Sequence, residues 1–108
     1  MSQKTHTSEI ILKVTLDENQ VPEKLQWTAE DGGVDKEDAK AMMLSVWDSE
    51  NKESLKIDLW TKDMPVDEMK IFFYQTLVAM SDTFLKATHD EKMTATMREF
   101  SDYFAEKL

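Results

Sequence analysis

Cysteine is absent from this sequence, and only two glycines, two prolines and a single arginine interrupt its 108 residues. Without thiols, neither a disulfide framework nor a thiolate metal site can form. The polar N-terminal segment lacks the apolar stretch of a signal peptide, and no apolar run approaches the length needed to span a bilayer. We therefore expect a cytoplasmic protein with no direct membrane insertion.

Basic residues are also scarce relative to acidic ones. The chain carries 22 Asp and Glu against 13 Lys and Arg, a formal net charge of −9, and no block of like charges stands out. A negative field of this size repels phosphate backbones and anionic membrane surfaces. The charge balance makes nucleic acid a poor partner and is typical of a soluble protein.

Alternating apolar residues in the first third of the chain predict two strands. The pattern has a period of two over residues 10–16, with Ile11 as the exception on the polar side, and again over residues 25–29. The short polar connection between them favours an antiparallel hairpin. Gly32-Gly33 ends the second strand and marks the backbone position that most needs a positive φ.

Two further strands are predicted over residues 41–48 and 55–61, with residues 49–54 as a polar loop. The stretch from Val34 to Lys40 is expected to form a helical turn. The most natural arrangement of the four strands is a single antiparallel meander.

Beyond Thr61 the apolar period changes from two to 3.6, which predicts helix. One apolar stripe comprises Val66, Met69, Phe73, Leu77, Met80, Phe84 and Ala87. A second comprises Met93, Met97, Phe100, Phe104 and Leu108. At about 100° per residue the two stripes would fall on opposite sides of one continuous helix, so we predict two helices with a break near Thr88.

Thr88 and Glu91 form a capping-box pattern at that break. Strands followed by two helices predict the α+β class, with a four-stranded antiparallel meander sheet followed by an αα-hairpin packed on one face. Residues 1–8 are expected to be a flexible tail, and residues 9–108 a single α+β domain.

Residues that carry chemistry are few and scattered. His6 and His89 lie far apart, and neither has the spacing to another histidine that a metal site needs. The acidic residues Asp48, Glu50 and Glu53 lie in one predicted hairpin but lack the ligand order and central glycine of a calcium loop. Arg98 is expected to be a surface or ion-pair residue. We predict no catalytic residues, no metal and no cofactor.

Aromatic residues give a stronger signal. Met43, Trp47 and Trp60 belong to the strand face opposite the apolar face of residues 41–61, and pairing across a loop of residues 49–54 would set Met43 against Trp60 and Trp47 against Lys56. An antiparallel sheet with helices on one side should be polar on the other. Met43, Trp47 and Trp60 are therefore the predicted protein-binding residues. Cover within the chain, a homodimer and a heterologous partner remain open alternatives for this face.

Several longer segments resemble the gliding-motility protein family GldC. These segments are Ala29-Glu30-Asp31-Gly32-Gly33, Leu44-Ser45-Val46-Trp47-Asp48, Ile57 through Met69, Tyr74-Gln75-Thr76-Leu77 and Phe100 through Lys107. The resemblance extends over nearly the whole chain after the tail, and its specificity comes from the length and order of the segments.

This resemblance implies a small cytoplasmic protein associated with the machinery that moves bacteria over surfaces. Its partners would be other gliding-motility or envelope-machinery proteins, among them the lipoprotein GldB, and the family brings no enzymatic activity. The leading hypothesis is a non-enzymatic accessory or adaptor protein that acts by protein–protein interaction. The alternatives are a self-associating structural protein with a tryptophan-rich dimer face, and a small-ligand binder.

Overall fold

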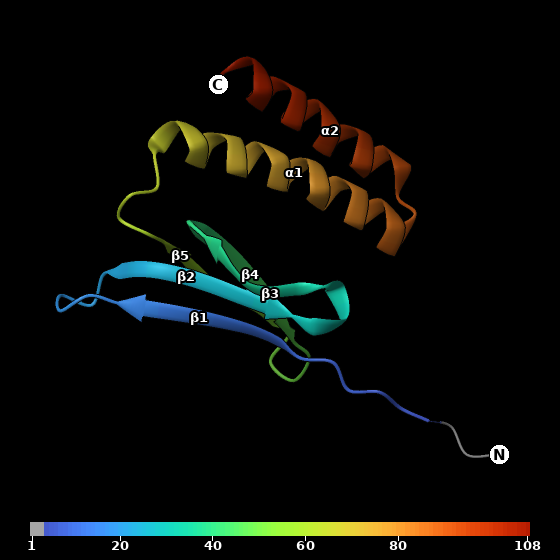
Figure 1. Ribbon diagram of the computed structural model, residues 1–108. Coiled ribbons are helices and arrows are strands. Elements are labelled where there is room, and N and C mark those ends of the chain that lie inside the picture. The colour runs from blue at the N-terminus through green and yellow to red at the C-terminus, as the bar shows by residue number, and fades with distance from the viewer. Residues whose placement is uncertain (1–3) are drawn as a thin grey trace. The chain divides into compact units, whose positions relative to one another are not determined.

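A computed structural model describes residues 4–108, and residues 1–3 of the predicted tail lie outside the described part. The chain divides into two compact units, Met1–Met64 and Pro65–Leu108. The elements are β1 (Ile10–Leu16), β2 (Pro22–Ala29), a 3-10 helix (Glu30–Gly32), β3 (Val34–Ala39), β4 (Ala41–Asp48), β5 (Glu53–Trp60), α1 (Val66–Thr88) and α2 (Glu91–Glu106) (Figure 1). The α+β class is therefore confirmed.

The first three strands form an antiparallel sheet in the order β1-β2-β3. Leu25 in the central strand lies opposite Val14 on one side and Ala39 on the other, so three apolar side chains form a row across one face. Leu25 is fully buried. The alternating pattern of β1 and β2 thus correctly puts Val14 and Leu25 on the apolar face of the sheet.

The helical turn expected from Val34 to Lys40 is wrong, because this segment forms β3. Four of its six residues are charged, so the strand has no period-two apolar pattern to reveal it. Gly33, with φ of 73°, takes the left-handed conformation expected for the Gly32-Gly33 pair and turns the chain back onto β2. Val34 then pairs with Ala29.

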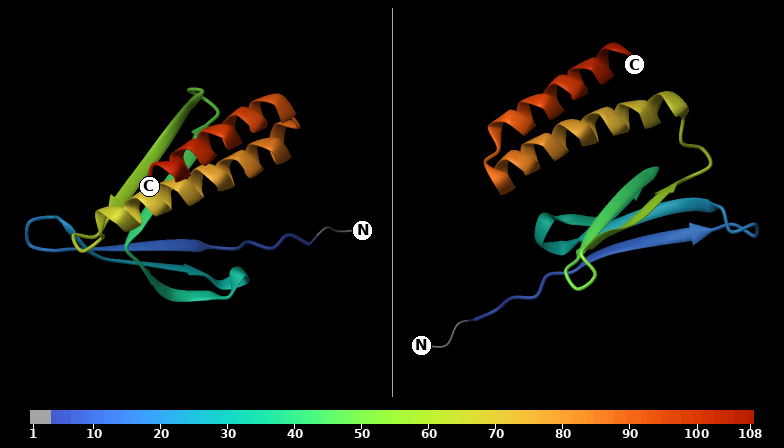
Figure 2. Two further views of the ribbon diagram at one scale, coloured as in Figure 1. Left: turned by 90° about the horizontal axis from the view of Figure 1, so that it is seen from above. Right: turned by 180° about the vertical axis from the view of Figure 1, so that it is seen from behind.

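The predicted four-stranded meander is also wrong, because β4 and β5 form a separate two-stranded sheet. Only Lys40 stands between β3 and β4. A tight antiparallel hairpin needs about two residues in its loop, so β4 has no room to fold back beside β3. The chain bends at Lys40, and the β4–β5 hairpin runs at an angle to the three-stranded sheet (Figure 2).

The predicted break between two helices is confirmed, and it falls at His89 and Asp90. His89 adopts φ of 58°, the left-handed conformation that ends many helices, and its N–H donates to the Leu85 carbonyl at 2.8 Å. The capping residue of α2 is Asp90, whose carboxylate accepts from the Met93 N–H at 3.0 Å.

The capping box expected at Thr88 is therefore wrong. The Thr88 hydroxyl donates to the Phe84 carbonyl at 2.8 Å, and its oxygen accepts from the Asp90 N–H at 3.1 Å. Thr88 thus remains in α1 and braces the turn into α2. Asp90 stands directly before Glu91, and its short side chain reaches the free N–H of Met93. Its negative charge also suits the positive end of the helix dipole.

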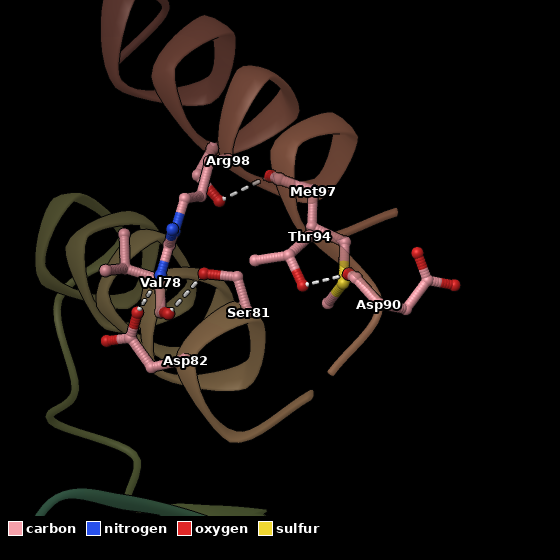
Figure 3. Close-up of polar contacts among 8 residues, drawn as sticks. Val78, Ser81, Asp82, Asp90, Thr94, Met97 and Arg98 are labelled. Carbon is pink, nitrogen blue, oxygen red and sulfur yellow. Dashed lines mark hydrogen bonds and ion pairs between the residues drawn. The ribbon is translucent and has the colours of Figure 1, made fainter. Parts of the chain in front are cut away.

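The two helices run in opposite directions and lie side by side (Figure 1). Small hydroxyl residues are buried along the seam between them. Ser81 of α1 and Thr94 and Ser101 of α2 are buried. The hydroxyls of Ser81 and Thr94 each donate at 2.7 Å to a carbonyl one turn earlier, that of Val78 and that of the cap residue Asp90 (Figure 3). The Ser101 hydroxyl donates to the Met97 carbonyl at 3.0 Å. Small side chains with internally satisfied hydroxyls let the helices approach without leaving buried polar groups unpaired.

The large apolar stripes of both helices lie beside this seam. At about 100° per residue, the stripe through Phe73 and Met80 is centred about 90° from Ser81 around α1, and the stripe through Met93 and Phe100 is displaced by a similar angle in the same rotational sense around α2. Because the helices are antiparallel, equal displacements put both stripes on one side of the hairpin. That side keeps Phe73, Met80, Met93 and Phe100 exposed.

Candidate protein-binding surface

The register of the β4–β5 hairpin corrects the predicted pairing of the aromatic residues. Met43 lies opposite Asp58, Trp47 opposite Ser54, and Trp60 opposite Ala41. The predicted contacts of Met43 with Trp60 and of Trp47 with Lys56 are therefore wrong. The register differs by two residues because the loop spans only residues 49–52, with Glu53 and Ser54 already in β5. An even shift leaves each side chain on its predicted face.

The two tryptophans share a face but lie at opposite ends of the hairpin. Six residues separate Ala41, the partner of Trp60, from Trp47, which corresponds to about 20 Å along a strand. The face between them is polar in its middle, where Lys56 and Asp58 form an ion pair of 3.0 Å between Nζ and Oδ2. Met43, Trp47 and Trp60 thus do not form one continuous apolar patch.

The outer end of the hairpin, next to its loop, is apolar on both faces. Trp47 is 61% exposed on one face. On the other face Val46 pairs with Leu55, and Ile57 pairs with Leu44. All of these side chains are exposed. We name Val46, Trp47, Leu55 and Ile57 the hairpin tip. The sequence analysis placed Val46, Leu55 and Ile57 on the apolar strand face and did not name them as binding residues.

The loop beside the tip is held by the carboxylate of Asp48. It accepts from the side-chain amide of Asn51 at 2.9 Å and from the backbone N–H groups of Asn51 and Glu50 at 3.4 and 3.0 Å. The Asn51 side chain is the main cause of the lowered pKa of Asp48, and the two backbone donors lower it further. The Asp48 carboxylate therefore stabilises the turn through these hydrogen bonds. The described residues 4–108 contain no cluster of His, Asp and Glu that could hold a metal ion.

The inner end of the hairpin, where β5 finishes, is anchored to the three-stranded sheet. The Thr61 N–H donates to the Lys40 carbonyl at 2.8 Å, and Thr61 is buried. The Lys62 N–H donates to the Pro22 carbonyl at 3.3 Å, while Lys62 Nζ lies 3.1 Å from Oδ2 of Asp17 in the β1–β2 turn. Trp60 immediately precedes this anchor, so it lies at the fixed end of the hairpin.

Carboxylates on both sides of the anchor are stabilised in their charged form. The pKa of Asp17 is lowered mainly by the Val21 N–H, then by the Lys62 side chain and the Asn19 N–H. The pKa of Asp63 is lowered mainly by the Thr61 hydroxyl, which donates to it at 2.5 Å. Asp17 and Asp63 thus hold the junction of the two sheets through these contacts.

His6, His89 and Arg98, the other polar residues considered in the sequence, each have a different local role and do not form a common site. His6 Nε2 lies 2.9 Å from Oδ2 of Asp31, an exposed pair near the start of the described chain. His89 ends α1. Arg98 is an ion-pair residue as predicted, with Nη2 at 2.9 Å from Oδ1 of Asp82 across the two helices (Figure 3).

The order of its elements makes this chain a small α+β protein in which antiparallel strands precede a helical hairpin. None of the helices among the described residues is long and apolar enough to cross a membrane. A family model described as "Gliding motility-associated protein GldC-like" matches residues 22–108. The chain therefore belongs to the GldC-like family, which confirms the resemblance seen in its segments. No match was found among curated proteins or among solved structures.

Proposed function

We propose that this protein is a non-enzymatic accessory protein of the bacterial gliding machinery, which acts in the cytoplasm by binding another protein of that machinery. Membership of the GldC-like family supports the association with gliding motility. The observation that carries the binding role is the hairpin tip, where Trp47 on one face and Val46, Leu55 and Ile57 on the other are all exposed.

A partner on the hairpin tip would solve a physical problem of this hairpin. A two-stranded ribbon is marginally stable in water unless a further layer packs against it. Here the inner end is anchored through Thr61 and Lys62, whereas the outer end carries large apolar side chains without an anchor. Burial of these side chains by a partner gains roughly 25 cal/mol for each Å² of apolar surface removed from water.

Trp47 is the best single anchor for such a partner. Tryptophan is enriched among residues that dominate binding energy, because a large rigid ring loses little conformational entropy on burial. The adjacent turn, fixed by Asp48, holds the strand end that presents the ring. The separation of Trp47 from Trp60 favours Trp47 over a tryptophan-rich face that includes both.

The test is binding of the purified protein to individual gliding-machinery proteins, measured by titration. Trp47→Ser should remain folded and weaken binding about 30-fold or more, the equivalent of about 2 kcal/mol for an interface anchor. Tyr103→Ser on α2 is the matched control, since Tyr103 is also an exposed aromatic residue. Unchanged affinity of a folded Trp47→Ser variant would overturn the role of the hairpin tip.

A further inference from the structure

The two edges of the three-stranded sheet differ sharply. The β3 edge carries Asp35, Lys36, Glu37 and Asp38 in succession, and Lys36 has a positive φ of 48°. A charged and irregular edge resists pairing with another strand. The β1 edge is seven residues long, and Lys13 is the only charged residue in it. β1 lies at the end of the sheet order and pairs with β2 alone (Figure 1).

We propose that β1 is a self-association edge, on which β1 of a second copy of this chain pairs in antiparallel orientation about a two-fold axis at Ile11. The product is a continuous six-stranded sheet. This surface is separate from the hairpin tip, so the proposal goes beyond the proposed function and does not depend on it.

The register follows from the residues of the edge. With Ile11 opposite its own copy, Ile10 lies opposite Leu12 of the second copy, and Glu9 lies opposite Lys13 of the second copy. The two-fold axis repeats the last two pairs, so five consecutive positions are complementary. Opposite charges and apolar side chains placed directly across from each other stabilise an antiparallel pair.

Competing registers lose the charge pairing. An axis at Leu12 keeps Ile10 opposite Val14, but it sets Lys13 opposite Ile11 and Glu9 opposite Thr15, so neither charge faces an opposite one. An axis at Lys13 would set the two lysines directly against each other, which destabilises the pair. An odd shift would place the apolar face of one β1 against the polar face of the other. Among the described residues, Glu9 and Lys13 form no ion pair in the monomer and both are exposed, so both charges are available to a second copy.

The register also explains the position of Ile11. In the monomer, Ile11 is 41% exposed and interrupts the polar face that Lys13 and Thr15 share with β2. Ile11 has no large apolar neighbour on that face, because the β2 residue directly opposite it is Thr28. In the proposed dimer the two Ile11 side chains contact each other on the same face, between the two Glu9–Lys13 pairs.

Charge exchange provides the first test, with mass in solution measured by analytical ultracentrifugation. The wild type should show a concentration-dependent mass rising from 12.6 kDa towards twice that value. Glu9→Lys or Lys13→Glu alone converts both attractive pairs into repulsive ones, and should raise the dimer dissociation constant roughly tenfold. The double variant Glu9→Lys, Lys13→Glu restores attraction and should recover the wild-type constant. Lys24→Glu, in the central strand, is the control and should change nothing.

Cysteine crosslinking provides the second test, since the natural chain has no thiol. Directly opposed residues of an antiparallel pair have Cα atoms about 4.5–5.5 Å apart, within the range of a disulfide. Mild oxidation should therefore link Ile11→Cys chains covalently. Thr15→Cys chains should remain unlinked, because two residues each four positions from the axis lie about 27 Å apart. A wild type that stays monomeric at every concentration, a double charge variant that fails to recover, or equal crosslinking of both cysteine variants would each overturn the proposal.

Discussion

The two units of this protein solve the packing problem in different ways. In the strand unit, Leu25 is buried at the centre of a sheet, and polar side chains such as Asp17 and Lys62 fix the turns and the junction around it. In the helical unit, the buried residues are Ser81, Thr94 and Ser101, whereas large side chains such as Phe73 and Phe100 stay exposed. The sheet thus uses bulk at its centre, and the helical hairpin uses small residues to bring two backbones together.

The difference reflects the geometry of the two kinds of element. A strand has only two faces, and in β1 and β2 most of the larger apolar residues lie on the face that buries Leu25. A helix has room for two distinct apolar faces about 90° apart, and the face with the smallest side chains allows the closest contact between helices. Because Trp27, Trp47 and Trp60 all lie in the strand unit, tryptophan fluorescence reports on that unit, and far-ultraviolet circular dichroism reports mainly on the helices.

The largest expected effect is at the centre of the sheet. Leu25→Ala removes a fully buried side chain between Val14 and Ala39 and leaves a cavity. It should cost about 2–5 kcal/mol of unfolding free energy, measured by denaturant unfolding with tryptophan fluorescence. Leu55→Ala, at an exposed position, is the control and should cost much less. Equal losses for the two variants would show that Leu25 is not the centre of this unit.

A smaller effect is expected in the helical seam. Ser81→Leu forces a large side chain between two closely packed helices and should cost about 1–3 kcal/mol, measured by circular dichroism. Ser81→Ala is the matched control. It removes only a hydroxyl that donates within its own helix to Val78, so the change should stay within about 0.5 kcal/mol. A Ser81→Leu variant as stable as the wild type would contradict a tight seam.

The smallest effect concerns Asp17 and depends on pH. Donors from Val21, Lys62 and Asn19 lower its pKa in the folded protein, so its contribution is fully present above the unfolded value of about 3.9 and is lost as the pH falls through the folded value. Asp17→Asn should therefore lower the melting midpoint near neutral pH, and the difference from the wild type should shrink below about pH 4. Glu18→Gln, in the same turn, is the control. A difference that does not vary with pH would exclude the charged form of Asp17 as its cause.

Particular residues show where sequence reasoning succeeds. Periods of two and 3.6 place β1, β2, β4, β5 and both helices. The 100° rotation per residue predicts a break near Thr88, and the structure has it at the next two residues, His89 and Asp90. These features are predictable because they depend on residues close together in the chain. The even shift in the β4–β5 register likewise leaves the faces of Met43, Trp47 and Trp60 as predicted, although their neighbours differ.

The misses have equally specific causes. β3 is hidden because a charged edge strand carries no alternating apolar pattern, and only its pairing with β2 defines it. The cap of α2 moves from Thr88 to Asp90 because two neighbouring residues can each serve, and the local backbone decides which oxygen reaches the free N–H groups.

The α+β class, the faces of the strands, the two helices and the family can all be read from the order of the residues. The division of the strands into two sheets becomes visible only in three dimensions. The same holds for the placement of Trp47 and Trp60 at opposite ends of a hairpin, and for the contrast between the open β1 edge and the charged β3 edge. The physical reason is that periodicity records which face of an element is apolar, whereas strand order and register depend on loop lengths and backbone pairing between distant residues.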